Sequence, residues 1–190
     1  MNNKPRPTLL LVTLLAFTLI AAGPAGAGWD PRKEESSNSE RSGSRATDTA
    51  IANLKASDPG IQIFFDKAHG YAVFPTVGKA GMFLGGAYGE GEVYKKGRFI
   101  GNSTLTQVTI GLQLGGQAYT EIIFFKDQRA LDNFTSGNFE LGAQASAIAL
   151  TAGVSADADY DNGVAIFTLP KKGLMYEATI AGQKFSFEPK

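Results

Sequence analysis

The sequence contains no cysteine and only one histidine, His69, among its 190 residues. Without cysteine the chain can form neither a disulfide nor a thiolate metal site, and it cannot carry a lipid on an N-terminal cysteine. A lone histidine argues against a zinc centre, and no G-x-S-x-G motif supplies a serine for this histidine to activate. These absences favour a non-enzymatic protein that uses no metal and no cofactor.

The chain also has no excess of charge, because 18 Lys and Arg balance 18 Asp and Glu. This balance does not predict a partner such as nucleic acid, whose binding proteins are usually basic. If an N-terminal leader that carries Lys4 and Arg6 is removed, 16 basic residues remain against 18 acidic ones, and the net charge is −2. Attraction to an anionic surface must therefore come from local clusters of basic side chains.

No apolar run reaches the roughly 20 residues that a membrane-spanning helix needs. The longest run, residues 8–22, follows two basic residues and precedes the tripeptide AGA at 25–27, which fits an A-x-A cleavage site. This pattern is typical of a secretory signal peptide. We therefore expect residues 1–27 to be removed on export, and the protein to be periplasmic or secreted rather than a lipoprotein.

The remaining chain divides into a polar segment and one domain. Residues 28–45 are rich in serine and mixed in charge, so we expect a disordered polar linker. Residues 46–190 are long enough for a single domain with its own core.

Hydrophobic periodicity within this domain predicts helices first and strands afterwards. Residues 47–69 carry a helical stripe that restarts at Asp58-Pro59, with the aspartate as N-cap. One further helix is expected over 126–134, and strand patterns occupy 71–76, 81–94, 98–114, 118–125, 139–156, 164–169, 174–180 and 184–188. Short connections favour antiparallel pairing. The predicted fold class is α+β: a large curved, mostly antiparallel β-sheet with N-terminal helices and one inserted helix.

The segment GKAGMFLGGAYGEG, residues 78–91, is dense in glycine and resembles a phosphate-binding loop at first sight. A P-loop requires Ser or Thr after the Gly-Lys pair, whereas Ala80 follows Gly78-Lys79 here. A dinucleotide fingerprint would open a helix, whereas this segment continues as a strand. The glycines therefore predict strand bends and close contacts between strands.

A second loop, DADYDNG at residues 157–163, resembles the start of a calcium-binding loop. The glycine and glutamate that such a loop requires at its sixth and twelfth places are Asn162 and Thr168 in this chain. Asn162-Gly163 is a strong signal for a hairpin turn. We predict a polar turn and no metal.

Two lysine-bearing segments, VYKKGRF and LPKKGLMY, are flanked by apolar strands and are expected to form exposed hairpin turns. One carries Lys95, Lys96 and Arg98, and the other carries Lys171 and Lys172. They are either simple solvated turns or contacts to anionic lipid headgroups, where each basic residue contributes ~1 kcal/mol.

Five segments occur in the order found in the SYLF lipid-binding domain family: AHGYAVFP, KAGMFLGGAYGEGEVY, GLQLGGQAYTEIIFF, FTSGNFELGAQAS and KGLMYEATIAG. The chain resembles this family over roughly residues 46–188, and it is most similar to the exported bacterial members. The family also includes the yeast actin-patch proteins. The resemblance implies a membrane-lipid-binding module and not an enzyme.

Eukaryotic members of the family bind phosphoinositides with help from a basic amphipathic N-terminal segment, and some bind actin. The corresponding segment here, ATDTAIANLKASDPG, has Lys55 as its only basic residue. The expected partner is therefore an anionic phospholipid surface, and neither actin nor nucleic acid is expected for an exported bacterial protein.

Our hypothesis is a lipid-binding module of the bacterial cell envelope that contacts anionic lipids through Lys95, Lys96, Arg98, Lys171 and Lys172, with Lys79 as a further candidate. Two alternatives remain open. One is a structural or adaptor domain that binds an envelope protein, and the other is a curved sheet that carries a small apolar ligand.

Overall fold

The computed structural model describes residues 31–137, 139–141 and 147–190, and it describes side chains over 44–110, 114–137, 139–141, 147–172 and 182–190. Its helices are α1 (Pro31–Ser57), η1 (Pro59–Ile61), α2 (Gln62–Lys67), α3 (Gln128–Thr135) and η2 (Val154–Asp157). Its strands are β1 (Gly70–Lys95), β2 (Arg98–Phe125), β3 (Phe139–Leu141), β4 (Ile148–Ala149) and β5 (Val164–Pro189). This mostly antiparallel sheet, with N-terminal helices and one inserted helix, confirms the predicted fold class.

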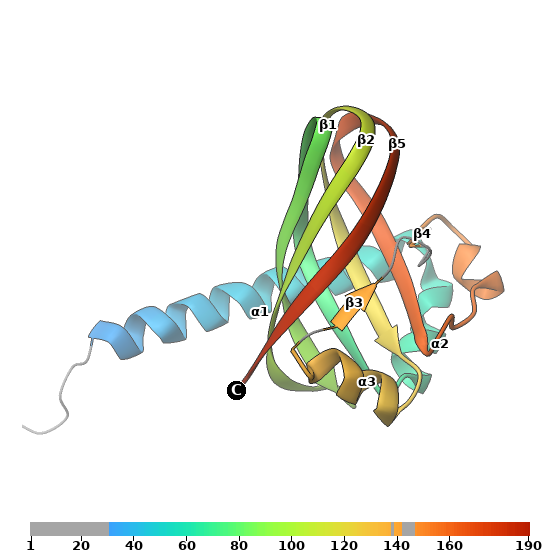
Figure 1. The fold of residues 1–190 in the computed structure, drawn as a ribbon. Coiled ribbons are helices and arrows are strands. Elements are labelled where there is room, and N and C mark those ends of the chain that lie inside the picture. Colours follow the sequence, from blue (N-terminus) through green and yellow to red (C-terminus); the bar gives the residue numbers. More distant parts are fainter. Residues whose placement is uncertain (1–30, 138, 142–146) are drawn as a thin grey trace, which may run out of the picture.

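Three long strands form most of the sheet, whose order is β1-β2-β5-β3, while the short β4 pairs with β5 in parallel. The sequence predicts seven shorter strands over the same residues: two within β1, two within β2 and three within β5. In the structure these join into three long strands, because each long strand bends over and continues instead of ending at its glycines (Figure 1). Phe83 has a φ of 66° at the bend of β1, where the pairing with β2 shifts register. The bends of β1, β2 and β5 lie side by side, and we call this end of the sheet the apex.

The bends divide the sheet into two layers that face each other. The first layer contains residues 70–81, 115–125 and 164–175, and the second contains residues 85–95, 98–109 and 181–189. Phe74 of the first layer lies 5.6 Å, centroid to centroid, from Phe185 of the second. Buried apolar side chains of both layers therefore form one core between them.

Helix α3 closes this core at the end opposite the apex, as Figure 1 shows. Asp127 caps the helix by accepting a hydrogen bond from the backbone N–H of Ala130 over 2.9 Å. Phe134 then packs 4.8 Å from Phe125 and 5.3 Å from Phe185, measured between ring centroids.

The glycines of β1 allow the layers to approach closely, which confirms their predicted structural role. A Cβ atom added to Gly91 would lie only 2.5 Å from the carbonyl oxygen of Val73, and one added to Gly89 would lie 2.8 Å from a methyl group of Val77. Only glycine fits where the opposite layer comes this close.

Helices α1 and α2 cover the outer face of the first layer. Leu54 and Phe64 are buried there, and the ring of Phe64 lies 5.0 Å from that of Phe167. Asp58 is the predicted N-cap of η1, accepting a hydrogen bond from Gly60 N–H over 3.0 Å. It also accepts one from Ser155 N–H over 2.8 Å, which ties η2 to the helices.

Helix α1 begins at Pro31, so most of the segment predicted to be a disordered linker is helical in the structure. Proline is favoured in the first turn of a helix because its missing N–H would have no partner there. The Lys, Glu and Arg residues of this segment are good helix formers. The expectation of disorder was based on polarity alone, and a polar helix that extends from a packed one does not need its own core.

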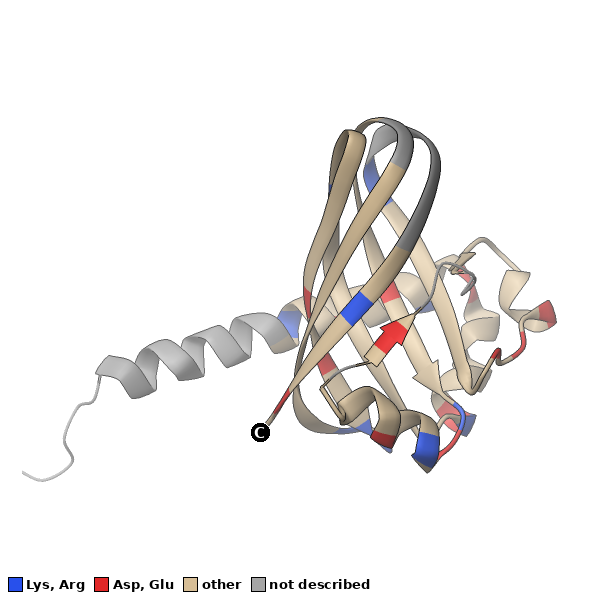
Figure 2. Ribbon diagram, in the orientation of Figure 1, with Lys and Arg blue, Asp and Glu red and all other residues tan. Residues whose placement is uncertain are grey.

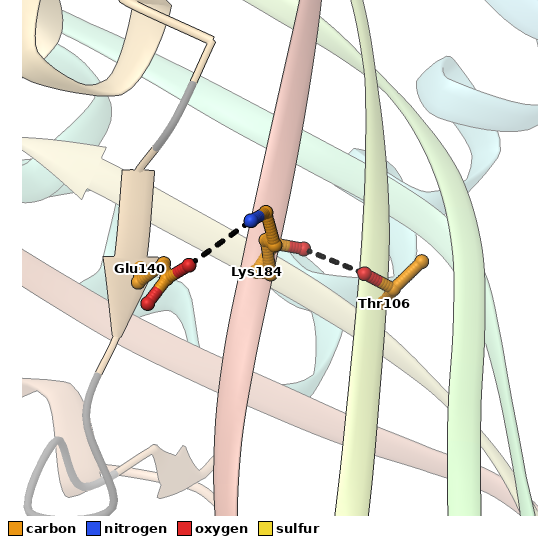
Figure 3. Close-up of polar contacts among 3 residues, drawn as sticks. All are labelled: Thr106, Glu140 and Lys184. Carbon is orange, nitrogen blue, oxygen red and sulfur yellow. Dashed lines mark hydrogen bonds and ion pairs between the residues drawn. The ribbon is translucent and has the colours of Figure 1, made fainter.

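The strand predicted over residues 139–156 is wrong in its extent. Among the described residues of this range, only those of β3 and β4 are in strands, and η2 begins after Gly153, which has a φ of 86°. Two members of the expected row of alternating alanines, Ala143 and Ala145, lie outside the described residues. An ion pair of 3.1 Å between Glu140 and Lys184 joins β3 to β5. The backbone carbonyl oxygen of Lys184 also accepts a hydrogen bond from the hydroxyl of Thr106 on β2 over 3.3 Å (Figure 3).

Candidate functional site

Large apolar side chains are exposed at the apex. Each of these six is between 59 and 68 % exposed, and we call them the apical patch: Met82, Phe83, Leu84, Val108, Ile110 and Leu114. Met82 pairs with Leu114 and Leu84 pairs with Ile110, so the patch runs across two neighbouring strands. Met82, Phe83 and Leu84 are consecutive and all exposed, so β1 is uncovered at its bend.

The apical patch is the main feature that our sequence reasoning missed. The alternation of apolar and polar residues predicts which residues share a face of a strand. We took the more apolar face to be the buried one. A usable signal was present, because the run MFL at 82–84 is apolar on both faces and is bounded by glycines on both sides. A strand of this kind is either buried on both faces or exposed on both.

Lys171 and Lys172 lie close to the apex, but they do not form the predicted turn. They lie within β5, where Lys172 pairs with Ala118, and an irregularity between Ala118 and Tyr119 accommodates the extra residue, Lys171. Pro170 and Gly173, which suggested a turn, instead flank a bulge in a continuous strand. Lys171 Nζ donates a hydrogen bond to Thr76 Oγ1 over 2.8 Å.

Lys95, Lys96 and Arg98 do lie at a hairpin turn, as predicted, between β1 and β2. Lys96 and Gly97 have φ values of 48° and 75°, and Lys96 N–H donates a hydrogen bond to the carbonyl of His69 over 3.1 Å. This bond places the turn at the end of the sheet opposite the apex.

The structure therefore does not bring the two lysine groups together. His69 is hydrogen-bonded to Lys96 and so marks the position of the turn at Lys95–Arg98. Gly78 marks the level of Lys172, because both residues pair with Ala118. At about 3.3 Å per residue, the stretch of β1 from His69 to Gly78 separates the groups by roughly 30 Å. Figure 2 accordingly shows basic residues both near the apex and at the opposite end. Lys79, the further candidate, is only 9 % exposed.

A shallow, largely open cleft of about 690 Å³ lies just below the apex. It is lined by both layers of β1, by the neighbouring part of β2 and by one residue of β5: Gly78, Lys79, Ala80, Gly86, Ala87, Tyr88, Gly116, Gln117, Ala118 and Lys172. The glycine-rich segment of the sequence thus lines a cleft, although it has none of the geometry of a phosphate-binding loop.

A carboxyl group is buried between the two layers. Glu121 is fully buried, and its Oε2 accepts a hydrogen bond from Nε2 of Gln183 over 3.0 Å, whereas Oε1 has no partner. Burial raises the pKa of Glu121 to about 7, although the hydrogen bond from Gln183 acts in the opposite direction. Among the described residues, no group of three His, Cys, Asp or Glu side chains is placed to hold a metal ion.

Comparison with known proteins identifies the family. Residues 106–190 match the family model Ysc84, described as Las17-binding protein actin regulator. This protein is a member of the SYLF family. The chain is 30 % identical over 141 residues to Beta cell expansion factor A of Aeromonas veronii, an alignment that covers 73 % of this chain and 53 % of the relative. The chain thus spans about half the length of this curated SYLF relative.

Membership of the SYLF family is compatible with a lipid-binding or adaptor role, and neither the family nor the named relative belongs to a class of enzymes. In the part of the chain that the structure describes, no helix is both long enough and apolar enough to span a bilayer. The apical patch, the adjacent lysines and the cleft are therefore the features of this SYLF domain from which a function can be argued.

Proposed function

We propose that this SYLF-family protein binds membrane surfaces that contain anionic lipids, and that it does so with the apex of its folded sheet. The observation that carries the proposal is the apical patch, in which six large apolar side chains are exposed on two adjacent strands. Exposed patches of this kind mark sites of contact with membranes or proteins.

The apical patch supplies most of the expected binding energy. Complete burial of a side chain such as Leu or Phe is worth about 1.5–3 kcal/mol, so partial insertion of six of them outweighs the ~1 kcal/mol expected from each nearby lysine. Lys171 and Lys172 add a preference for anionic lipids. Binding of this kind is expected to weaken in high salt without disappearing, because only its electrostatic part is screened.

The backbone at the apex is suited to a nonpolar environment. Ile110, at the bend of β2, pairs with Leu84 on one side and with Ile180 on the other. Its peptide groups are therefore hydrogen-bonded within the sheet. A free peptide group in hydrocarbon costs several kcal/mol, and the paired central strand avoids that cost.

The proposal includes export of the protein to the periplasm or the surroundings of the cell, where envelope membranes are accessible. Its support is the signal-peptide pattern over residues 1–27, which lie outside the described residues. The lysine turn at Lys95–Arg98 has no part in the proposed contact, because it lies at the opposite end of the sheet.

Co-sedimentation of the purified protein with vesicles tests the proposal. We expect binding to phosphatidylglycerol-containing vesicles and weaker binding to phosphatidylcholine vesicles. Phe83→Asp and Ile110→Asp should each abolish most of this binding. Ile63→Asp is the matched control, because Ile63 is 47 % exposed and lies on α2, away from the apex.

A double variant, Lys95→Glu with Lys96→Glu, tests the opposite end of the sheet. Unchanged vesicle binding by this variant, together with loss of binding by Phe83→Asp, supports the apex as the contact surface. The reverse result would assign the contact to the lysine turn. If the unmodified protein binds no vesicles, the alternative of an adaptor that uses the apical patch to bind a protein takes the place of the lipid proposal.

A further inference from the structure

We propose that the cleft below the apex binds the acyl chain of a single-chain anionic amphiphile, whose charged head lies beside Lys172. Fatty acids and lysophospholipids with an anionic head share this chemistry. Capture of such a ligand from a membrane would rest on the function proposed above, whereas binding of the free amphiphile does not.

The cleft has room for such a chain. Its volume of about 690 Å³ falls within the range of roughly 300–1,000 Å³ that is typical of small-molecule sites. The space exists because small residues line it, among them Gly78, Ala80, Gly86 and Gly116.

Two glycines of β1 differ in the space around them. A Cβ atom on Gly91 would collide with the opposite layer at 2.5 Å, whereas one on Gly78, which lines the cleft, would meet nothing within 4 Å. Position 78 therefore has room for a larger side chain.

The lining suits an apolar chain with an anionic end. Glycine and alanine supply most of the wall, and the ring of Tyr88 is part of it. The phenol of Tyr88 donates a hydrogen bond to Glu90 over 2.8 Å, so its polar end already has a partner. The charged residues of the lining are Lys79 and Lys172, and no acidic residue is among them. The exposed ammonium group of Lys172 therefore favours a carboxylate or phosphate head.

The cleft is continuous with the apical patch. Ala80 precedes Met82 by two residues on β1, and Gly116 follows Leu114 by two residues on β2. Apolar surface therefore connects the cleft to the apical patch along these two strand segments.

Calorimetric titration with defined amphiphiles, each below its critical micelle concentration, tests the proposal. We expect palmitate and 1-palmitoyl-lysophosphatidylglycerol to bind with about one molecule per protein, and octanoate to bind at least about tenfold more weakly because it buries fewer methylene groups. The neutral-headed 1-palmitoyl-lysophosphatidylcholine should also bind more weakly. Binding of palmitate alone would restrict the ligand to fatty acids, and binding of the lysophospholipid alone would restrict it to phosphate heads.

Two neighbouring lysines provide a matched pair of variants. Lys172→Glu should weaken binding of the anionic amphiphile about tenfold, as expected for reversal of one charge beside the ligand, whereas Lys171→Glu should not, because Lys171 does not line the cleft. Both variants change the net charge equally, so they should reduce vesicle binding alike. Gly78→Leu should fill the cleft and weaken palmitate binding without changing vesicle binding.

Absence of binding by all four amphiphiles would overturn the proposal, even if the protein binds vesicles. Equal binding of the neutral and anionic lysophospholipids, with Lys172→Glu and Lys171→Glu indistinguishable, would overturn the assignment of the head to Lys172. Thermal unfolding of each variant checks that the fold is retained. Octanoate binding to the unmodified protein tests the role of the chain even if Gly78→Leu fails to fold.

Discussion

Gln183 and Glu121 join the two layers of the folded sheet through a partly buried hydrogen bond of 3.0 Å. Glu121 belongs to β2 in the first layer and Gln183 to β5 in the second. The carboxyl group is fully buried and one of its oxygens has no partner. Because the charged form of such a group is poorly solvated, the protonated form is favoured in the folded protein.

The stability of the protein should therefore depend on pH through Glu121. Its pKa is raised from 4.5 to about 7 by burial, so the folded state binds a proton that the unfolded state releases. The stabilisation is fully present below pH 4.5 and is lost as the pH rises through 7. At ~1.4 kcal/mol per pKa unit, the loss is about 3 kcal/mol.

Urea unfolding of the wild type and of Glu121→Gln between pH 5 and pH 8.5 measures this effect. The glutamine resembles the protonated carboxyl group, so the variant should lose most of the fall in unfolding free energy that the wild type shows between pH 5 and about pH 7. Parallel pH profiles for the two proteins would show that Glu121 does not titrate in this range.

Gly91→Ala should destabilise the sheet. The added methyl group would lie 2.5 Å from the carbonyl oxygen of Val73 and 2.6 Å from the ring of Phe74, and such overpacking costs about 1–3 kcal/mol. Gly78→Ala is the control, because its methyl group meets nothing within 4 Å. We expect it to be neutral or to stabilise by up to about 0.5 kcal/mol, since alanine restricts the unfolded chain. Chemical denaturation of both variants measures the difference, and equal midpoints would contradict the close contact of the layers.

Asp58→Ala should destabilise the helical side of the molecule. It removes the acceptor for the N–H groups of Gly60 and Ser155, and loss of a cap together with an unpaired buried donor costs about 1–3 kcal/mol. Asp58→Asn keeps one oxygen acceptor and should lose less. A variant with unchanged thermal stability would indicate that water replaces both hydrogen bonds.

Export should leave a mature N-terminus at Gly28. The sequence places an A-x-A site at residues 25–27, and signal peptidase requires a small residue directly before the cut. Intact-mass measurement of the protein recovered from a bacterial host tests this, with Ala27→Leu expected to accumulate as precursor. Recovery of the full-length chain in the cytoplasm would contradict the proposed export.

Much of the fold was predictable because it depends on local chemistry. The caps at Asp58 and Asp127, and the turns at Lys96-Gly97 and Asn162-Gly163, each require residue types that the sequence displays. The period of two in the last strand placed Phe185 on a buried face, where it packs against Phe74. These features involve residues close together in the chain, so short patterns determine them.

Only the tertiary structure decided where the strands end and what covers them. Gly78, Gly86 and Gly91 look alike in the sequence, yet Gly91 touches the opposite layer whereas Gly78 and Gly86 line a cleft, because the neighbours of each glycine in the fold are different. In the same way, Phe83 and Phe74 are both strand phenylalanines, but the first is exposed at a bend and the second is buried. The sequence by itself determined the family, the helices that Asp58 and Asp127 cap, and the alternation of faces. Folding the sheet over at the apex separated the two lysine groups and exposed the apical patch, since burial depends on partners that are distant along the chain.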